Sequence, residues 1–211
     1  MIDDLACLMY LLAHDNAAEG PYDRSRTELL VRAAALTDLA LRGRLGEDGG
    51  TVTVTGTRST GDPVLDDVLR DAAGHGWKHL VRRHRKRTLV QVEDRLAAAG
   101  VLTVKAPRTR FGTRRLTVTD RAVPAALRAR VSAVLHGHGP VQEVPTADAA
   151  LLALAAAGRI RSVVSRQDRT AFRARIDACT RSLAVLAPGL EKAVRALPTT
   201  MIAAQGGMGG S

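Results

Sequence analysis

The sequence predicts a mainly α-helical fold: a single helical-bundle domain of amphipathic helices with a protruding β-hairpin. Apolar residues recur at three- and four-residue steps along most of the chain, which is the spacing of amphipathic helices. No repeat or long linker divides the 211 residues, and 45% of them are hydrophobic, enough for a substantial core. We therefore expect one domain over residues 1–200 and a disordered, glycine-rich tail over residues 201–211.

Each predicted helix or strand is based on a pattern in its own segment of the sequence. We expect helices near residues 5–14, 26–42, 64–73, 80–99, 124–135, 147–157, 168–186 and 189–197. Asp62 followed by Pro63 predicts a helix N-cap, and Gly43 and Gly100 predict helix ends. Alternating Thr and Val over residues 51–55 predicts an exposed strand. Residues 101–104 and 116–119 are β-prone and flank an arginine-rich turn, which predicts the hairpin.

Positive charge is concentrated in the middle of the chain. Lys and Arg number 31 against 21 Asp and Glu, so the net charge is 31 − 21 = +10. Residues 81–130 hold 14 positive and 3 negative side chains, a local 14 − 3 = +11. Such an excess attracts an anionic partner, either nucleic acid, a membrane surface or an acidic protein. Because aromatic residues make up only 2%, a stacking platform for single-stranded nucleic acid is disfavoured.

Composition and motifs also bear on location and catalysis. Cys7 and Cys179 form no motif, which indicates a reducing, cytoplasmic environment. The apolar run over residues 5–13 is too short to span a membrane and follows Asp3 and Asp4 rather than positive charge. No phosphate-loop, dinucleotide, zinc-protease or serine-hydrolase motif occurs. We therefore expect no catalytic residue, no cofactor and no metal site.

Arg32 is the most unusual charged residue in the sequence. On a helical wheel it lies between Leu36 and Leu39, at the edge of the stripe that faces the core. A charge placed there needs a partner. The simpler alternative is an ion pair with Glu28, one turn earlier, or a side chain that reaches to solvent. The functional alternative is an arginine that binds an anion in a pocket.

The start of the predicted helix over residues 80–99 points to the same chemistry. Positive side chains gather there, although a helix N-terminus favours acidic groups. A phosphate or an anionic headgroup would compensate for this placement through charge-assisted hydrogen bonds, whereas a solvated positive face needs no ligand. The cluster consists of Arg82, Arg83, Arg85, Lys86 and Arg87.

The order of helix, short strand and arginine-rich hairpin also occurs in winged-helix modules, whose basic wing touches phosphates. A DNA-binding protein that uses residues 80–99 and the hairpin is therefore the alternative prediction, with nucleic acid the less favoured partner.

Several segments together resemble the Golgi phosphoprotein 3 family, which includes many bacterial members. The matching stretches are residues 11–15 (LLAHD), 39–45 (LALRGRL), 59–66 (STGDPVLD) and 96–102 (LAAAGVL), in the family's order and spacing over roughly residues 5–200. The resemblance implies an α-helical domain with a protruding hairpin. It also implies a non-enzymatic peripheral membrane adaptor that binds phosphatidylinositol 4-phosphate or a related anionic lipid headgroup.

The resemblance assigns candidate residues. The family's headgroup pocket maps onto Arg32 and Lys86, which match its basic positions. Its Trp position falls on Asp23, beside Tyr22, and its second basic position on Leu89, so Arg82, Arg83, Arg85 or Arg87 would have to substitute. The resemblance places membrane contact or self-association in the hairpin, whose tip here carries Arg108, Arg110, Phe111, Arg114 and Arg115. Membrane-protein tails and a second copy of the chain are the other partners it implies.

Overall fold

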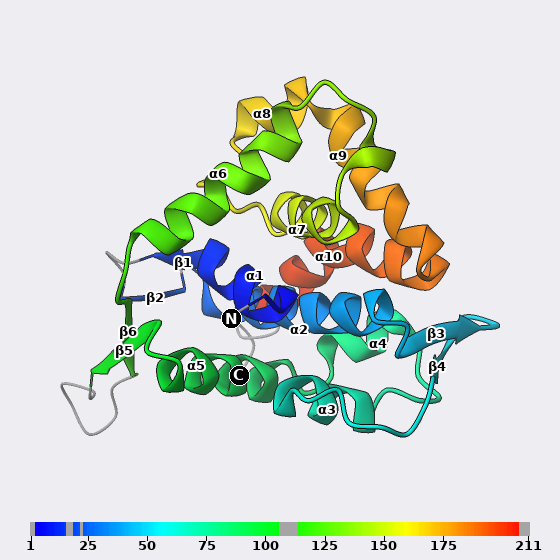
Figure 1. The fold of residues 1–211 in the computed structure, drawn as a ribbon. Helices are drawn as coiled ribbons and strands as arrows, with labels where there is room; N and C mark the ends of the chain where they lie inside the picture. Colours follow the sequence, from blue (N-terminus) through cyan, green and yellow to red (C-terminus); the bar gives the residue numbers. More distant parts are fainter. Residues whose placement is uncertain (1–2, 16–18, 22, 106–113, 207–211) are drawn as a thin grey trace.

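The computed structural model describes residues 3–15, 19–21, 23–105 and 114–206. Over these residues the chain forms ten α-helices and three small two-stranded antiparallel sheets (Figure 1). The predicted class, mainly α with a β-hairpin, is therefore confirmed.

Three helices form the centre of the molecule: α1 (Leu5–Ala13), α2 (Arg24–Leu41) and α7 (Thr146–Ala157). Almost every residue of α1 and α7 is buried, because both helices are apolar on all sides. On one side lie α6 (Ala122–His136), α8 (Arg166–Ala171) and α9 (Arg173–Ser182), and on the other lie α3 (Pro63–Arg70), α4 (Trp77–Arg82) and α5 (Arg85–Ala98) (Figure 1). The last helix, α10 (Pro188–Gly206), packs against α2, α4 and α7.

The strands form hairpins at the edges of the bundle. β5 (Leu102–Lys105) pairs with β6 (Arg115–Val118), which confirms the predicted hairpin. β4 (Thr51–Val54) confirms the predicted exposed strand and pairs with β3 (Leu45–Asp48), which the sequence analysis missed. Gly49 and Gly50, with φ of 55° and 81°, make the two-residue turn between these strands. The third pair, β1 (His14–Asp15) with β2 (Gly20–Pro21), follows α1.

The predicted continuous helix over residues 80–99 is wrong. The chain forms α4 and α5 instead, and they are separated at Arg83 and His84. His84 adopts a left-handed conformation with φ of 52°, which no continuous α-helix can contain. The break lies inside the basic cluster, so Arg82 ends one helix while Arg85 begins the next.

Two other helices also differ from expectation. The region of the predicted helix over residues 168–186 forms α8, α9 and a 3₁₀ turn over Leu183–Val185, and Phe172 separates α8 from α9. α10 extends to Gly206, so residues 201–206 of the predicted disordered tail are helical. Met201 explains the extension, because its side chain is only 3% exposed and packs in the core. Residues 207–211 lie outside the described residues.

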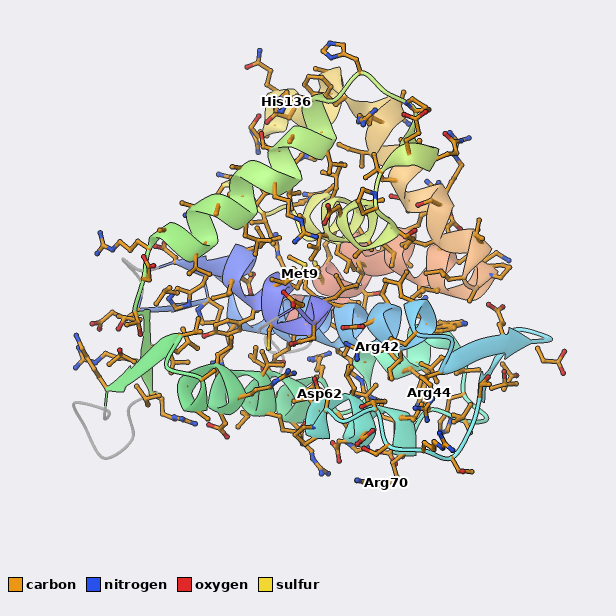
Figure 2. The ribbon with its side chains drawn as sticks, in the orientation of Figure 1. Met9, Arg42, Arg44, Asp62, Arg70 and His136 are labelled. Atoms are coloured by element: carbon orange, nitrogen blue, oxygen red, sulfur yellow. The ribbon has the colours of Figure 1, made fainter. Side chains whose placement is uncertain are left out.

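An ionic network braces the junction of α1, α2, α3 and α5. Asp62 caps α3 by accepting hydrogen bonds from the backbone N–H of Val64 and Leu65, and Arg95 of α5 binds both Asp62 and Asp4. Asp4 caps α1, and Asp38 accepts hydrogen bonds from the Leu5 backbone N–H and from Arg42. We call this set (Asp4, Asp38, Arg42, Asp62 and Arg95) the bracing network; Figure 2 shows Arg42 and Asp62 on either side of the helix junction.

Candidate anion-binding site

The break between α4 and α5 opens a cavity of about 890 Å³ on the surface. We call its lining residues the basic connection: Lys78, His79, Arg82, Arg83, His84, Arg85 and Lys86. They comprise five Lys or Arg, two His and no carboxylate, so the wall of the cavity is positive throughout.

Most of these charges have no ion-pair partner. Arg85 pairs with Glu28 of α2 at 3.2 Å, and the His84 imidazole lies 3.2 Å from Asp71. For Lys78, Arg82, Arg83 and Lys86, by contrast, no carboxylate oxygen of the described residues lies within 4 Å. The Nε atom of Arg83 is buried and makes no hydrogen bond among the described residues. These groups are available to an anionic ligand.

Arg32 lies behind the basic connection and holds its two ends together. Its side chain is 1% exposed, as the helical wheel predicted. Nε donates to the backbone carbonyl of Leu80 in the last turn of α4 at 3.1 Å, and Nη1 donates to the Thr88 hydroxyl in α5 at 3.1 Å. The Leu80 carbonyl belongs to the last turn of α4, where carbonyls lack helical partners, so the guanidinium acts as a cap.

The predicted ion pair between Arg32 and Glu28 does not form, because Glu28 pairs with Arg85. Burial lowers the pKa of Arg32 to about 10, against the opposing attraction of Asp71 and Asp67. Its Nη2 atom is buried without a hydrogen-bond partner among the described residues. The positive charge behind the cavity is therefore only partly compensated by the protein itself.

The start of α5 adds backbone donors to this positive region. His84 precedes α5 and provides no side-chain cap, and α5 has no acidic residue in its first turn. The first backbone N–H groups of a helix have no partners within the helix, and together with the helix dipole they attract anions. Lys86 therefore occupies a helix start that is unfavourable for positive charge, whereas Arg85 and Arg87 are balanced by Glu28 and Asp67.

Two further predicted pocket residues, Arg87 and Asp23, are not gathered at this cavity. Arg87 pairs with Asp67 at 2.6 Å and does not line the cavity. Asp23 caps α2 by accepting a hydrogen bond from the backbone N–H of Arg26, and it lies roughly 13 Å along the helix from Arg32. Tyr22 lies outside the described residues.

The arginines of the hairpin base are paired within the protein. Arg114 lies 2.8 Å from Asp94, and Arg115 lies 2.9 Å from Glu19. The hairpin follows the end of α5 opposite to the basic connection, about 21 Å away by the length of that helix. Arg108, Arg110 and Phe111 lie outside the described residues.

Sequence reasoning missed Lys78 and His79 as lining residues, because the predicted helix began three residues too late, at Leu80 rather than Trp77. Gly74 and Gly76, on either side of His75, were the available signal, since glycines mark a loop immediately before a new helix. It also missed Thr88, whose hydroxyl accepts a hydrogen bond from Arg32, because the two residues lie 56 positions apart in the sequence and meet only in the folded chain.

Among the described residues, no helix is long and apolar enough to cross a membrane. Within the same part of the chain, no three His, Cys, Asp or Glu side chains are grouped so that they could hold a metal ion.

The sequence was also compared with known proteins. None of the curated proteins matches the chain. The sequence model of one family, described as Golgi phosphoprotein 3 (GPP34), matches residues 5–197, which is nearly the whole chain. The chain is therefore a member of the Golgi phosphoprotein 3 (GPP34) family.

Proposed function

We propose that this protein is a non-enzymatic peripheral membrane adaptor on the cytoplasmic face of a membrane. Its basic connection binds phosphatidylinositol 4-phosphate or a related phosphorylated lipid headgroup. The observation that carries the proposal is a cavity lined by five Lys or Arg and no carboxylate, at an uncapped helix start. Family membership supports the same role, because the resemblance had already implied a lipid-binding adaptor.

The structure suggests a division of tasks among the basic residues. Arg82, Arg83 and Lys86 would contact the phosphate, since they line the cavity without an ion pair among the described residues. Arg32 would act as a positioning residue, because its contacts with Leu80 and Thr88 fix the distance between α4 and α5. Each basic residue near an anionic leaflet contributes roughly 1 kcal/mol, so these residues suffice for reversible attachment.

The test is vesicle flotation at near-physiological salt. Vesicles of neutral phosphatidylcholine are compared with vesicles that also contain phosphatidylglycerol, phosphatidylinositol or phosphatidylinositol 4-phosphate. We expect wild type to float preferentially with the 4-phosphate. The variant Arg82→Ala/Lys86→Ala should bind at least about tenfold more weakly, because two such contacts contribute roughly 2 kcal/mol.

A matched control removes two positive charges elsewhere. Arg173→Ala/Arg181→Ala lies on α9, on the other side of the bundle from α4 and α5 (Figure 1), and should float like wild type. Equal loss in both variants would reduce binding to net charge and overturn the assigned site. Equal flotation with every anionic lipid would contradict phosphoinositide preference, and no flotation at all would contradict the membrane function.

A further inference from the structure

A second cavity lies on the other side of α2 from the basic connection. Its volume is about 590 Å³, within the range of cavities that hold small-molecule ligands. The end of α1, the start of α2, the start of α6 and the turn after α7 form its walls. Its apolar part consists of Leu12, Leu30, Pro124 and Ile160.

The polar part of this cavity is rich in arginine. Five arginines line it, with two carboxylates, Asp15 and Asp23, so the lining carries 5 − 2 = +3. Arg26 has partners within the protein, because its guanidinium lies 3.4 Å from the Asp23 carboxylate and donates a hydrogen bond to the Gly158 carbonyl. The other four have no carboxylate oxygen within 4 Å among the described residues; they are Arg121, Arg128, Arg159 and Arg161.

The four arginines converge from two elements. Arg121 precedes α6 and Arg128 lies seven residues later, so both belong to one face of that helix. Arg159 and Arg161 belong to the turn that follows α7. Convergence of like charges on a half-apolar cavity is unfavourable unless an anion occupies it.

The backbone at Arg159 gives an independent indication. Three helices of this chain, α2, α5 and α7, end in the same pattern, in which the residue after the C-cap is left-handed and the next N–H bonds back into the helix. Gly43 and Gly100 fill the left-handed position in the first two, with φ of 65° and 72°. Arg159 fills it in the third, with φ of 53°. An arginine is strained there relative to glycine, and strained residues cluster at functional sites.

Gly158 precedes the left-handed position by one residue, but its role is in packing and not in the helix end. A Cβ at Gly158 would clash with the Leu30 side chain, so the close packing of α7 on α2 favours glycine at that position. Nothing of the kind requires arginine at position 159, whose side chain is exposed at the cavity.

Positive charge also accumulates beyond the rim. Burial first, and then the charges of Arg159, Arg166 and Arg161, lower the pKa of Arg169. The end of the molecule that carries Arg159 therefore holds positive charges that repel one another in the absence of an anion.

We propose that this second cavity binds a small amphipathic anion, a molecule with a short apolar chain and a phosphate head. The chain would lie against Ile160, which is partly exposed at the cavity, whereas Leu12 and Leu30 are buried in its wall. The phosphate would accept hydrogen bonds from Arg128 and Arg159. The site is separate from the headgroup site of the basic connection, so either can exist without the other.

Isothermal titration calorimetry with octyl phosphate tests this proposal on the full chain. Inorganic phosphate and octyl glucoside, which carry only the charge and only the apolar chain, are the comparison probes. We expect one octyl phosphate per chain in this site and binding at least about tenfold weaker for both comparison probes, because each lacks half of the interactions. Equal affinity for inorganic phosphate or for octyl glucoside would overturn the amphiphile assignment.

The variant Arg159→Gly separates binding from stability. Glycine suits the left-handed position, so the melting temperature should stay equal or rise, whereas octyl phosphate affinity should fall about tenfold. Arg128→Gln, which keeps the backbone and removes the second head contact, should lower affinity to a similar extent. Unchanged affinity in both variants would overturn the site.

Two controls assign the loss to this cavity. Arg173→Ala on α9 removes one exposed positive charge and should keep octyl phosphate affinity. Arg82→Ala/Lys86→Ala should also keep it, while Arg159→Gly should keep vesicle flotation. If the basic-connection variant lost octyl phosphate binding instead, the ligand would belong to that site and this inference would fail while the proposed function stood.

Discussion

Arginine has different surroundings in two regions of this protein. In the bracing network, Arg95 contacts the carboxylates of Asp4 and Asp62, and Arg42 contacts Asp38. In the basic connection, Arg82 and Arg83 have no carboxylate within 4 Å among the described residues, although they belong to the same half of the bundle. The same residue type holds helices together in one region and exposes uncompensated charge in the other.

This difference separates the segments that identify the family from the residues to which we assign ligand binding. Arg42 and Arg44 belong to the Arg-Gly-Arg segment that carries the resemblance, and Asp62 belongs to its Thr-Gly-Asp segment. Figure 2 shows the three residues around the helix junction and the base of the β3–β4 hairpin, where Arg44 donates to the backbone carbonyl of Thr55. The most recognisable segments therefore stabilise the fold, whereas the proposed ligand contacts lie in a region with little motif.

The largest expected effect is on the bracing network. Arg95→Ala leaves Asp4 and Asp62, which are 4% and 6% exposed, without their shared cation. We expect the free energy of unfolding to fall by about 3 kcal/mol, the lower end for a broken buried pair because the Arg95 side chain is 30% exposed.

Urea denaturation measures this change at pH 7. Arg173→Ala, which removes an arginine with no such buried partners, should change stability by less than about 0.5 kcal/mol. The folded fraction of the Arg95 variant should still float with vesicles. Loss of flotation without loss of stability would show that the bracing network belongs to the membrane site, and the comparison would break down.

The hairpin base should behave like the bracing network, on a smaller scale. Arg115 pairs with Glu19, and the Glu19 carbonyl accepts a hydrogen bond from the Leu116 backbone N–H, so the hairpin is tied to the segment before β2. Arg115→Gln should lower the free energy of unfolding by about 1 kcal/mol, because the pair is partly exposed. Vesicle affinity should change by less than about twofold. A loss of vesicle binding as large as that of Arg82→Ala/Lys86→Ala would place the hairpin base at the membrane instead.

Local patterns predicted the parts of the fold that depend on local physics. Asp62, Pro63, Gly43 and Gly100 mark helix ends because capping and left-handed backbone are decided within a few residues. The wheel placed Arg32 at the edge of the core-facing stripe, because helical periodicity alone fixes which face a residue occupies, and the fold buries it there.

Long-range pairing accounts for what was missed. Spacing offered Glu28 as the partner of Arg32, yet Glu28 pairs with Arg85, 57 residues later in the chain. Arg32 instead binds a backbone carbonyl and a hydroxyl, which no charge pattern indicates. The break before α5 was missed because residues 82–87 contain no glycine or proline to mark it, and only the left-handed His84 reveals it. β3 was missed because its sequence, LGED, has no β-branched residue.

The smallest expected effect is a pH dependence at Asp66, which belongs to the same segment as Asp62. The Ser59 hydroxyl and the Thr60 backbone N–H donate to its carboxylate and lower its pKa below the ordinary value of 3.8. Since the unfolded chain then binds the proton more readily, Asp66 stabilises the fold above about pH 4, and this contribution is lost as pH falls through the folded pKa.

Asp66→Asn should therefore be less stable than wild type at pH 6, and the difference should shrink as the pH approaches 3, as urea denaturation across this range would show. The variant should float with vesicles like wild type at pH 7. A pH-independent difference would mean that the hydrogen bonds do not favour the ionised carboxylate. Reduced flotation would mean that the Thr-Gly-Asp segment, which here only closes the turn before α3, also takes part in binding. A stability difference that disappears at acid pH, with flotation unchanged, would place Asp66 with the bracing residues and leave ligand binding to the basic connection.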